Sequence, residues 1–277
     1  MNNVSTLYEA LGQEAPGAVS GAMPVAVAPE VPTRRLLGLD FADLAVTQAA
    51  SWIARRPQGA SFGYVVTPNA DHLVRLSRVP ALLPLYRAAS MCLLDSRVVA
   101  RVSRILGLPA PCVTPGSDLT EHLLREHLVA GERVTIIGLR RQHLAALVAR
   151  TGMAAPAHYD PPIGFDQDPV ELERAVRFVI DNPARYVFLA VGSPRQERLA
   201  DAIAASGRAT GTGLCIGASL DFVAGAMPRA PGFMQRMGIE WLHRMLSDPR
   251  RLARRYLLDN PPIFWLLWRE RRRGRSI

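Results

Sequence analysis

Short apolar runs alternate with amphipathic stretches along most of the chain. The runs are rich in Val, Ile and Leu and have the length of buried strands. The segments between them repeat apolar residues every three or four positions, as helices do. We expect strands over residues 35–41, 62–66, 91–94, 134–137, 186–191 and 213–216. We expect helices over residues 42–55, 70–89, 97–106, 118–129, 141–150, 170–180 and 195–205, with Ser117 capping the fourth and Glu121 placed to close a capping box.

Continuous apolar strands separated by helices indicate a parallel sheet covered on both faces. The predicted fold class is therefore α/β, a Rossmann-like parallel sheet with helices on both faces. We assign residues 34–226 to this core and residues 227–277 to a helical, basic appendage. Residues 1–33 are rich in Ala, Gly, Pro and Val without periodicity, so we expect a flexible leader there.

Glycines and short polar side chains follow several predicted strands, at the edge where parallel α/β sheets bind ligands. These segments are residues 67–72, 95–97, 138, 192–197 and 217–221. Glycines there let a ligand approach the backbone, and the helix N-termini that follow offer N–H groups to a phosphate. Ordinary strand-to-helix turns use the same residue types, so each segment alone is a weak signal.

Composition adds exclusions and a charge asymmetry. The 277 residues are 49% hydrophobic and 21% charged, which is typical of a globular protein. All 33 basic residues are arginine, which excludes a Walker-type phosphate loop and a lysine Schiff base. Residues 227–277 hold 12 arginines and 4 acidic residues, a net charge of +8 out of +9. Such a tail suits nucleic acid, an anionic membrane or a phosphorylated ligand.

Cysteine usage and hydropathy indicate a cytoplasmic protein. Cys92, Cys112 and Cys215 are odd in number and far apart, which argues against a disulfide framework and against a CxxC zinc site. No apolar run reaches the roughly 18–20 residues of a membrane-spanning helix. The first 33 residues lack a basic region ahead of an apolar core, so a secretory signal is not expected.

Taken together, the motifs resemble the WecG/TagA/CpsF family of bacterial glycosyltransferases. The resemblance runs from about residue 35 to residue 256 and rests on TPNADH, LLDSRVV, VGSPRQE, the turn over residues 217–221 and MPRAPGFMQRMGIEWLHRMLSDPRRLARRYL. It implies an inverting transferase that moves a sugar from a UDP-sugar to a polyprenyl-diphosphate-linked saccharide. The reaction would take place at the cytoplasmic face of the membrane, in surface or exopolysaccharide synthesis, without a cofactor.

Inverting transfer needs a base for the acceptor hydroxyl. Asp95 matches the proposed catalytic base of the family, and partial burial after a strand would make a carboxylate more basic. Ser96 stands where the family usually has glycine. Asp95 has an alternative role as the cap of the helix that begins near Arg97.

Thr67, Asn69 and Gln196 match positions that the family uses near the reacting sugar. Hydroxyl and amide side chains at strand ends can bond sugar hydroxyls or a phosphate oxygen without adding charge. Asn69 has an alternative role as a helix cap. Glu197 is an alternative carboxylate, although we favour a role for it in the first turn of a helix.

The candidate nucleotide-binding residues are Gly138, Gly192, Gly217 and Asp221. The glycines leave room for a phosphate at strand ends, and Asp221 would take ribose hydroxyls, by analogy with other α/β sheets.

The resemblance also implies catalysis without a metal. Residues 166–168 match the DxD motif of many UDP-sugar enzymes, but Asp168 followed by Pro169 is typical of a helix N-cap and first position. With no metal expected, arginine must neutralise the leaving diphosphate. Arg244, Arg251 and Arg254 lie seven and three residues apart, compatible with one helical face, and the resemblance places them in an appendage that closes over the active site.

The same tail mixes aromatic residues with its arginines: Trp241, Tyr256, Phe264, Trp265 and Trp268. This mixture suits peripheral association with an anionic membrane surface. The alternative is a nucleic-acid-binding α/β protein that uses the tail electrostatically, but RRM and zinc-finger signatures are missing, so no nucleic-acid partner is expected.

The donor sugar stays open between two types. UDP-N-acetylmannosamine or its uronic acid are frequent donors in the family, whereas the exopolysaccharide, GumM-like branch uses UDP-glucose. Ser96 and the arginine-only basicity favour the second type.

Overall fold

The computed structural model describes residues 31–57, 59–227, 230–237, 240–247 and 249–273, so residues 1–30 of the predicted leader lie outside it. Its strands are β1 (Thr33–Leu36), β2 (Leu39–Ala42), β3 (Gly63–Val66), β4 (Met91–Cys92), β5 (Val134–Gly138), β6 (Ala157–Tyr159), β7 (Tyr186–Ala190) and β8 (Thr212–Cys215). Its core helices are α2 (Val46–Arg55), α3 (Ala70–Arg78), α4 (Leu83–Arg87), α5 (Arg97–Ile105), α6 (Gly116–His122), α7 (Arg141–Thr151), α8 (Pro169–Asp181), α9 (Arg195–Ala205) and α10 (Ser219–Val223).

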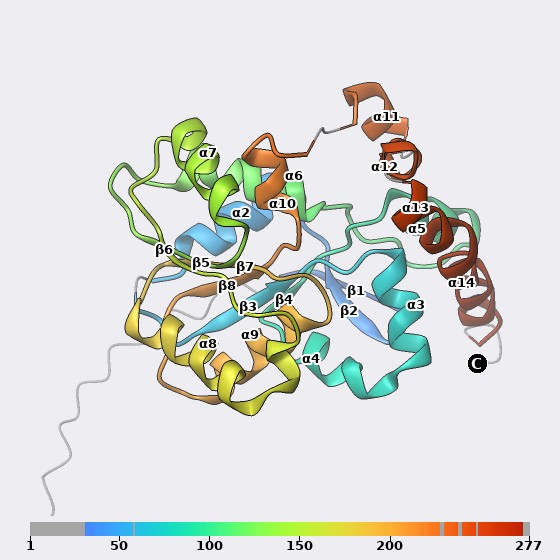
Figure 1. Ribbon diagram of the computed structural model, residues 1–277. Coiled ribbons are helices and arrows are strands. Elements are labelled where there is room, and N and C mark those ends of the chain that lie inside the picture. The colour runs from blue at the N-terminus through green and yellow to red at the C-terminus, as the bar shows by residue number, and fades with distance from the viewer. Residues whose placement is uncertain (1–30, 58, 228–229, 238–239, 248, 274–277) are drawn as a thin grey trace, which may run out of the picture. The chain divides into compact units, whose positions relative to one another are not determined.

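Six strands form one parallel sheet in the order β4-β3-β8-β7-β5-β6 (Figure 1). Helices α3, α4, α8 and α9 lie on one face, and α2, α6, α7 and α10 lie on the other (Figure 1). Along β3, Tyr64 and Val66 pack into the first layer and Val65 into the second, so apolar residues occupy both faces. The predicted α/β class, a Rossmann-like parallel sheet covered on both faces, is confirmed.

The expected strand over residues 35–41 is wrong. β1 and β2 pair as an antiparallel hairpin outside the main sheet. Leu37 and Gly38 join them with φ values of 49° and 79°. Two consecutive residues with positive φ make the tight turn that suits two-residue hairpins, and the apolar run across Leu37 hid this turn.

Three further expectations need correction. The helix expected over residues 70–89 ends at Arg78 and resumes in a 3-10 turn, Pro80–Leu82, and in α4, because proline at position 80 cannot continue a helix. Ser117 is not an N-cap: α6 begins at Gly116 after Pro115 and runs into a π-helical turn, Leu123–His127. Strand β6 was not expected, since three half-buried residues give no clear period.

The C-terminal segment is helical, as expected. It contains α11 (Gly232–Met237), α12 (Glu240–Ser247), α13 (Pro249–Arg254), a π-helical turn (Arg255–Asp259) and α14 (Pro262–Arg273). α14 contacts α3 and α5 (Figure 1). Its Ile263 and Leu267 are fully buried and belong to the same hydrophobic cluster as one face of the sheet. Among the described residues, no helix has the length and apolar character needed to cross a bilayer.

Candidate functional site

Three predicted site segments meet at the carboxyl edge of the sheet. β8 pairs with β3 on one side and with β7 on the other, so the loops after these strands are neighbours. The Thr67 hydroxyl, after β3, donates to the Cys215 carbonyl at 3.3 Å. The Gly217 N–H, after β8, donates to Oε1 of Gln196 at 2.9 Å. The structure therefore brings together Thr67, Gln196 and Gly217.

Asp95 joins this group from the segment that follows β4, the strand at the edge of the sheet. Its backbone N–H donates to the Pro68 carbonyl at 3.0 Å, and its Oδ2 accepts from the Gly116 N–H at 3.3 Å. A Cβ at Gly116 would lie 2.9 Å from the Thr67 hydroxyl, so only glycine fits between the two loops without a shift. Asp95 and Thr67 thus both lie next to Gly116.

The alternative role of Asp95 as a cap is wrong. Ser96 caps α5, accepting from the Val99 N–H at 3.2 Å. The serine that replaces the usual glycine therefore has a structural task, and the Asp95 side chain is directed to the Gly116 N–H instead.

The alternative role of Asn69 is confirmed. Its Oδ1 accepts from the N–H groups of Asp71 and His72, at 3.0 and 3.3 Å, and so caps α3. The cap uses the side-chain oxygen only. Capping and sugar binding are compatible, because the amide nitrogen is not part of the cap.

Gln196 and Glu197 form a buried pair in the first turn of α9, where Glu197 was expected. Their exposed fractions are 2% and 1%. Nε2 of Gln196 donates to Oε1 of Glu197 at 2.9 Å, which fixes the orientation of the amide whose oxygen receives Gly217. Burial, reinforced by the Glu197 carboxylate, raises the pKa of the Cys215 thiol, so this cysteine stays protonated at neutral pH.

The two remaining glycines adopt positive φ, 85° at Gly138 and 77° at Gly192. A Cβ at Gly138 would also lie 2.9 Å from the backbone of Ala190 on the neighbouring strand. The sheet itself therefore requires glycine at 138, whatever binds there. His158 holds the same turn, with Nε2 at 2.9 and 2.8 Å from the carbonyl oxygens of Gly138 and Leu139.

Asp221 lies in α10 and contacts a residue that the sequence analysis missed. Its Oδ1 is 2.7 Å from Nδ1 of His143 in α7. His143 follows β5 in the first turn of a helix, so the strand-end rule that selected Asp221 also applies to it. Nε2 of the same ring lies 3.1 Å from Nε2 of Gln142, so both ring nitrogens of His143 have partners.

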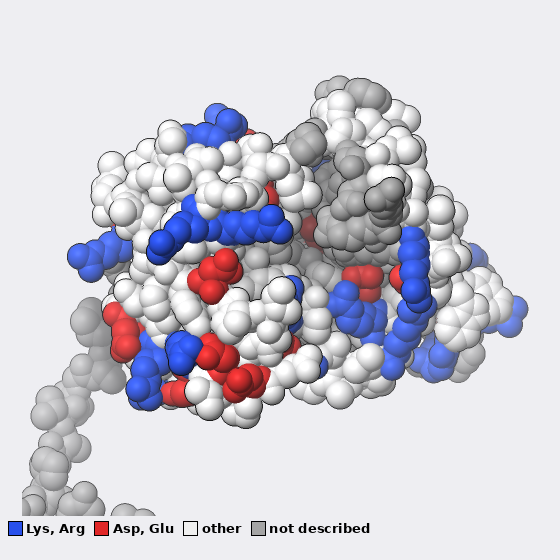
Figure 2. All heavy atoms as spheres, in the orientation of Figure 1, with Lys and Arg blue, Asp and Glu red and all other residues white. Residues whose placement is uncertain are grey.

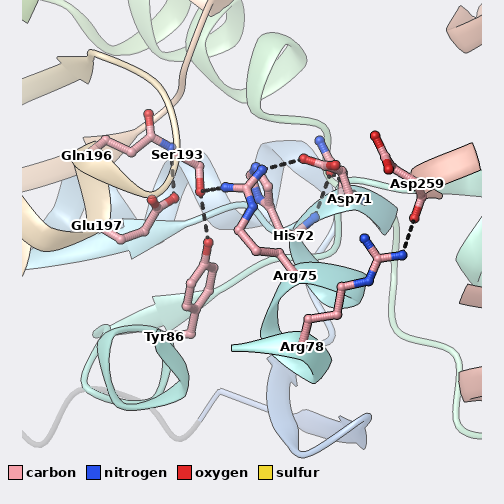
Figure 3. A network of polar contacts seen from close by, with 10 residues as sticks. Asp71, His72, Arg75, Arg78, Tyr86, Ser193, Gln196, Glu197 and Asp259 are labelled. Carbon is pink, nitrogen blue, oxygen red and sulfur yellow. Dashed lines mark hydrogen bonds and ion pairs between the residues drawn. The ribbon is translucent and has the colours of Figure 1, made fainter. Parts of the chain in front are cut away.

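A second missed group surrounds Arg75, one of the residues of α3 (Figure 3). Its Nη2 lies 2.6 Å from Oδ2 of Asp71, and its Nη1 donates to the Ser193 hydroxyl at 3.2 Å. The Tyr86 hydroxyl lies 3.2 Å from the same serine oxygen. Burial raises the pKa of Tyr86, so it remains a neutral phenol. An Arg within a helix carries no sequence signal of such a contact.

The three arginines predicted to bind the leaving diphosphate lie in α12 and α13. Arg254 is exposed at the end of α13. The side chains of Arg244 and Arg251 lie outside the described part of the structure, so the predicted alignment of the three guanidinium groups remains a prediction. Figure 2 shows a hollow on this face between the core and the C-terminal helices, with acidic and arginine side chains at its margin.

α14 presents aromatic rings on the side away from its buried residues. Trp265 and Trp268 are 53% and 43% exposed, and Phe264 is 49% exposed. Arg269 and Arg272 stack over the two indole rings, at 5.2 and 3.9 Å from the ring centroids. The side chains of Trp241 and Tyr256 lie outside the described residues.

The DxD-like segment has structural partners. Asp168 caps α8 by accepting from the Val170 N–H at 2.9 Å, and Pro169 is the first helical residue, as expected. Asp166 is paired with Arg198 at 2.9 Å. In the described part of the chain, no group of three or more His, Cys, Asp or Glu side chains is arranged to hold a metal ion.

Comparison with known proteins identifies the family of this chain. The profile of the "Glycosyl transferase WecG/TagA/CpsF family" matches residues 34–277. The N-acetylglucosaminyldiphosphoundecaprenol N-acetyl-beta-D-mannosaminyltransferase of Staphylococcus aureus strain MW2 is 28% identical over 235 residues, which cover 83% of this chain and 89% of that protein. The protein of the same name from strain MRSA252 is 27% identical over 235 residues, with the same coverage. The chain therefore belongs to the WecG/TagA/CpsF family of glycosyl transferases.

Proposed function

We propose that this chain transfers a hexose or N-acetylhexosamine from a UDP-sugar to a polyprenyl-diphosphate-linked saccharide, with inversion at the anomeric carbon. The main support is the meeting of Thr67, Asp95, Gln196 and Gly217 at one edge of the sheet in a chain of this family. The names of the staphylococcal relatives describe transfer of N-acetylmannosamine to a diphosphoundecaprenol-linked sugar. Membership of the family also favours glycosyl transfer over nucleic-acid binding.

In this proposal Asp95 is the general base. Its carboxylate takes the proton of the acceptor hydroxyl while that oxygen attacks C1 of the donor sugar. The bond from C1 to the diphosphate oxygen breaks, and UDP leaves with the bonding electron pair. Attack from the face opposite the leaving group inverts the configuration. The Gly116 N–H orients the carboxylate, and Thr67 and Asn69 bind hydroxyls of the sugar.

The leaving diphosphate gains negative charge as the bond breaks. Arg244, Arg251 and Arg254 would neutralise it, because guanidinium groups bind phosphate oxygens bidentately and stay charged. Gly138, Gly192 and Gly217 would leave room for the nucleotide, and the Asp221 and His143 pair would bind the ribose. The proposed reaction needs no metal.

The appendage would also bring the enzyme to its lipid-linked acceptor at the inner face of the membrane. The exposed Trp265 and Trp268, together with Arg269 and Arg272, suit the interface of an anionic bilayer. Docking there would complete the site beside the lipid-linked acceptor, with the appendage arginines at the leaving diphosphate of the donor.

The decisive experiment tests a panel of donor sugars with the wild-type protein and measures the effect of replacing Asp95 by asparagine. Purified protein is incubated with UDP-glucose, UDP-N-acetylmannosamine and its uronic acid, each with short-chain prenyl-diphosphate acceptors bearing glucose or N-acetylglucosamine. We expect one donor to be transferred. Asp95→Asn should lower kcat by about 10³-fold or more, the scale of losing a general base, while UDP binding and folding persist.

Asp168→Asn is the matched control, because asparagine caps a helix as well as aspartate does. It should keep full activity, and EDTA should not reduce the wild-type rate. Retained turnover in Asp95→Asn would remove the base assignment. Loss of turnover in Asp168→Asn, or a strict requirement for Mg²⁺ or Mn²⁺, would restore the metal alternative.

A further inference from the structure

Two loops of the site are separated by the width of a strand. Thr67 and Asn69 follow β3, whereas Gly192 and Gln196 follow β7. β8 lies between β3 and β7 in the sheet. Adjacent strands are about 4.8 Å apart, so the two loops start roughly 10 Å from one another. A direct bond between these loops therefore needs a long side chain.

Arg75 supplies this bond (Figure 3). It projects from α3, the helix that Asn69 caps, and its guanidinium reaches Ser193 in the β7–α9 loop. On the α3 side Asp71 holds the same guanidinium at 2.6 Å. On the other side the Tyr86 hydroxyl, from α4, contacts Ser193 at 3.2 Å. The serine hydroxyl is thus held from two helices.

The contacts from Asp71 through Arg75 to Ser193 form a bridge between the two loops. Each end of this bridge lies next to a proposed substrate-binding residue. The Asp71 N–H donates to the Asn69 side chain, so the anchor of Arg75 lies within the same helical cap. Ser193 is three residues before Gln196, whose backbone N–H donates to the Gly192 carbonyl. Gln196 then receives the Gly217 N–H from the third loop. Hydrogen bonds and the short chain segment from Gly192 to Gln196 thus connect Asn69 with Gly217.

We propose that Arg75 is a positioning residue for glycosyl transfer, which fixes the spacing between the β3–α3 loop and the β7–α9 loop. The inference rests on the proposed function, in which these two loops hold the reacting sugar. Misplacement by about 1 Å can cost on the order of 100-fold in rate without removing a substrate contact. Arg75 acts through Ser193 and Asp71 and need not touch either substrate.

The bridge depends on the shape of the guanidinium group as well as on its charge. Arg75 uses two different nitrogens for its two partners. The planar fork of arginine holds two acceptors at fixed angles, whereas the ammonium of lysine is a single point. Arg75→Lys keeps the charge but loses the fork. Ser193→Ala keeps the whole guanidinium and removes its far partner, together with the contact of that serine to the Tyr86 hydroxyl.

The test compares these two variants with Arg78→Gln. Arg78 lies on the same helix, is exposed, and donates only to the Asp259 carbonyl, at 3.5 Å, among the contacts described. We expect Arg75→Lys and Ser193→Ala each to lower kcat by about tenfold or more while KM for the UDP-sugar changes by less than about threefold. The double variant should lose less activity than the product of the two single losses, since both substitutions cut the contact between Arg75 and Ser193.

A second measurement does not depend on activity. Hydrogen exchange of the backbone amides in residues 192–198 should accelerate in both variants and remain unchanged in Arg78→Gln. Thermal unfolding should show that all three remain folded. Full kcat in Arg75→Lys would overturn the proposal. A rise in KM alone would overturn it too, because Arg75 would then bind substrate by charge. Absence of transfer by the wild type would reject the proposed function, while the exchange result would still report on the bridge.

Discussion

At the scale of single residues, Asn69 combines a structural and a proposed chemical task. Its oxygen caps α3, and its amide nitrogen is available to a sugar hydroxyl in the proposed function. The two tasks can be separated, because serine also caps helices but carries no amide.

We therefore expect Asn69→Ala to lower the free energy of unfolding by about 1 kcal/mol, the usual cost of a lost cap. Asn69→Ser should lower the free energy of unfolding by only a few tenths of about 1 kcal/mol, because serine is also a good cap. Both variants should lose kcat/KM if the amide contacts the sugar. Urea unfolding and steady-state kinetics measure the two effects, and a Ser variant with wild-type kcat/KM would leave Asn69 with the cap alone.

The site was only partly predictable at this scale. Thr67, Asp95, Gln196 and Gly217 could be selected because parallel strands bring their carboxyl ends to one edge. Arg75 could not, since its importance comes from the strand order, which places β8 between two loops. The role of His158 could not be predicted for the same reason, because it contacts the turn after β5 from the neighbouring strand β6.

At the scale of elements, α14 has two chemically different sides. Leu267 has no exposed surface and packs with the core, whereas Trp268, the next residue, is 43% exposed. One side contributes to folding and the other, in our proposal, to membrane contact.

Leu267→Ala should therefore lower the free energy of unfolding by about 2–5 kcal/mol, the range for truncating a buried leucine. Trp268→Ala should change it by less than about 1 kcal/mol, as exposed substitutions do, but should weaken binding to anionic vesicles. Urea unfolding and vesicle sedimentation measure the pair. If Leu267→Ala lowered the free energy of unfolding by less than about 1 kcal/mol, α14 would not be packed against the core.

Elements with strong periodicity were predicted well and short ones were not. The helix expected over residues 195–205 coincides with α9, and five of the expected strands overlap strands of the sheet. The hairpin β1–β2 was missed because Leu37, an apolar residue, occupies a turn position with positive φ. The Leu37 N–H donates to Glu270 of α14, and a contact across the whole chain is invisible to local periodicity.

At the scale of the whole molecule, the charge asymmetry is the dominant feature. A nearly neutral stretch up to residue 226 precedes a segment with a net charge of +8. If this charge attracts an anionic bilayer, binding must weaken as salt screens it.

We expect sedimentation with vesicles that contain anionic phospholipid, and little with zwitterionic vesicles. Binding should fall strongly near 1 M NaCl, where the screening length is about 3 Å, and a residual part should persist through the aromatic rings. Equal binding to both vesicle types would reject the electrostatic part of the proposal. Tight binding to oligonucleotides without affinity for UDP would instead favour the nucleic-acid alternative.

Because one side of α14 is buried and the other exposed, we expect the two sides to be under different evolutionary pressures. Ile263 and Leu267 are constrained by the packing of the protein core, whereas Trp265 and Trp268 are exposed and are not constrained by that packing. Selection would remove substitutions of the buried residues of α14, because they reduce the amount of folded protein in the cell whatever lipids that cell contains. If the exposed side contacts lipid, as we propose, it is free to change with the composition of that lipid, so residues side by side in the sequence should diverge at different speeds.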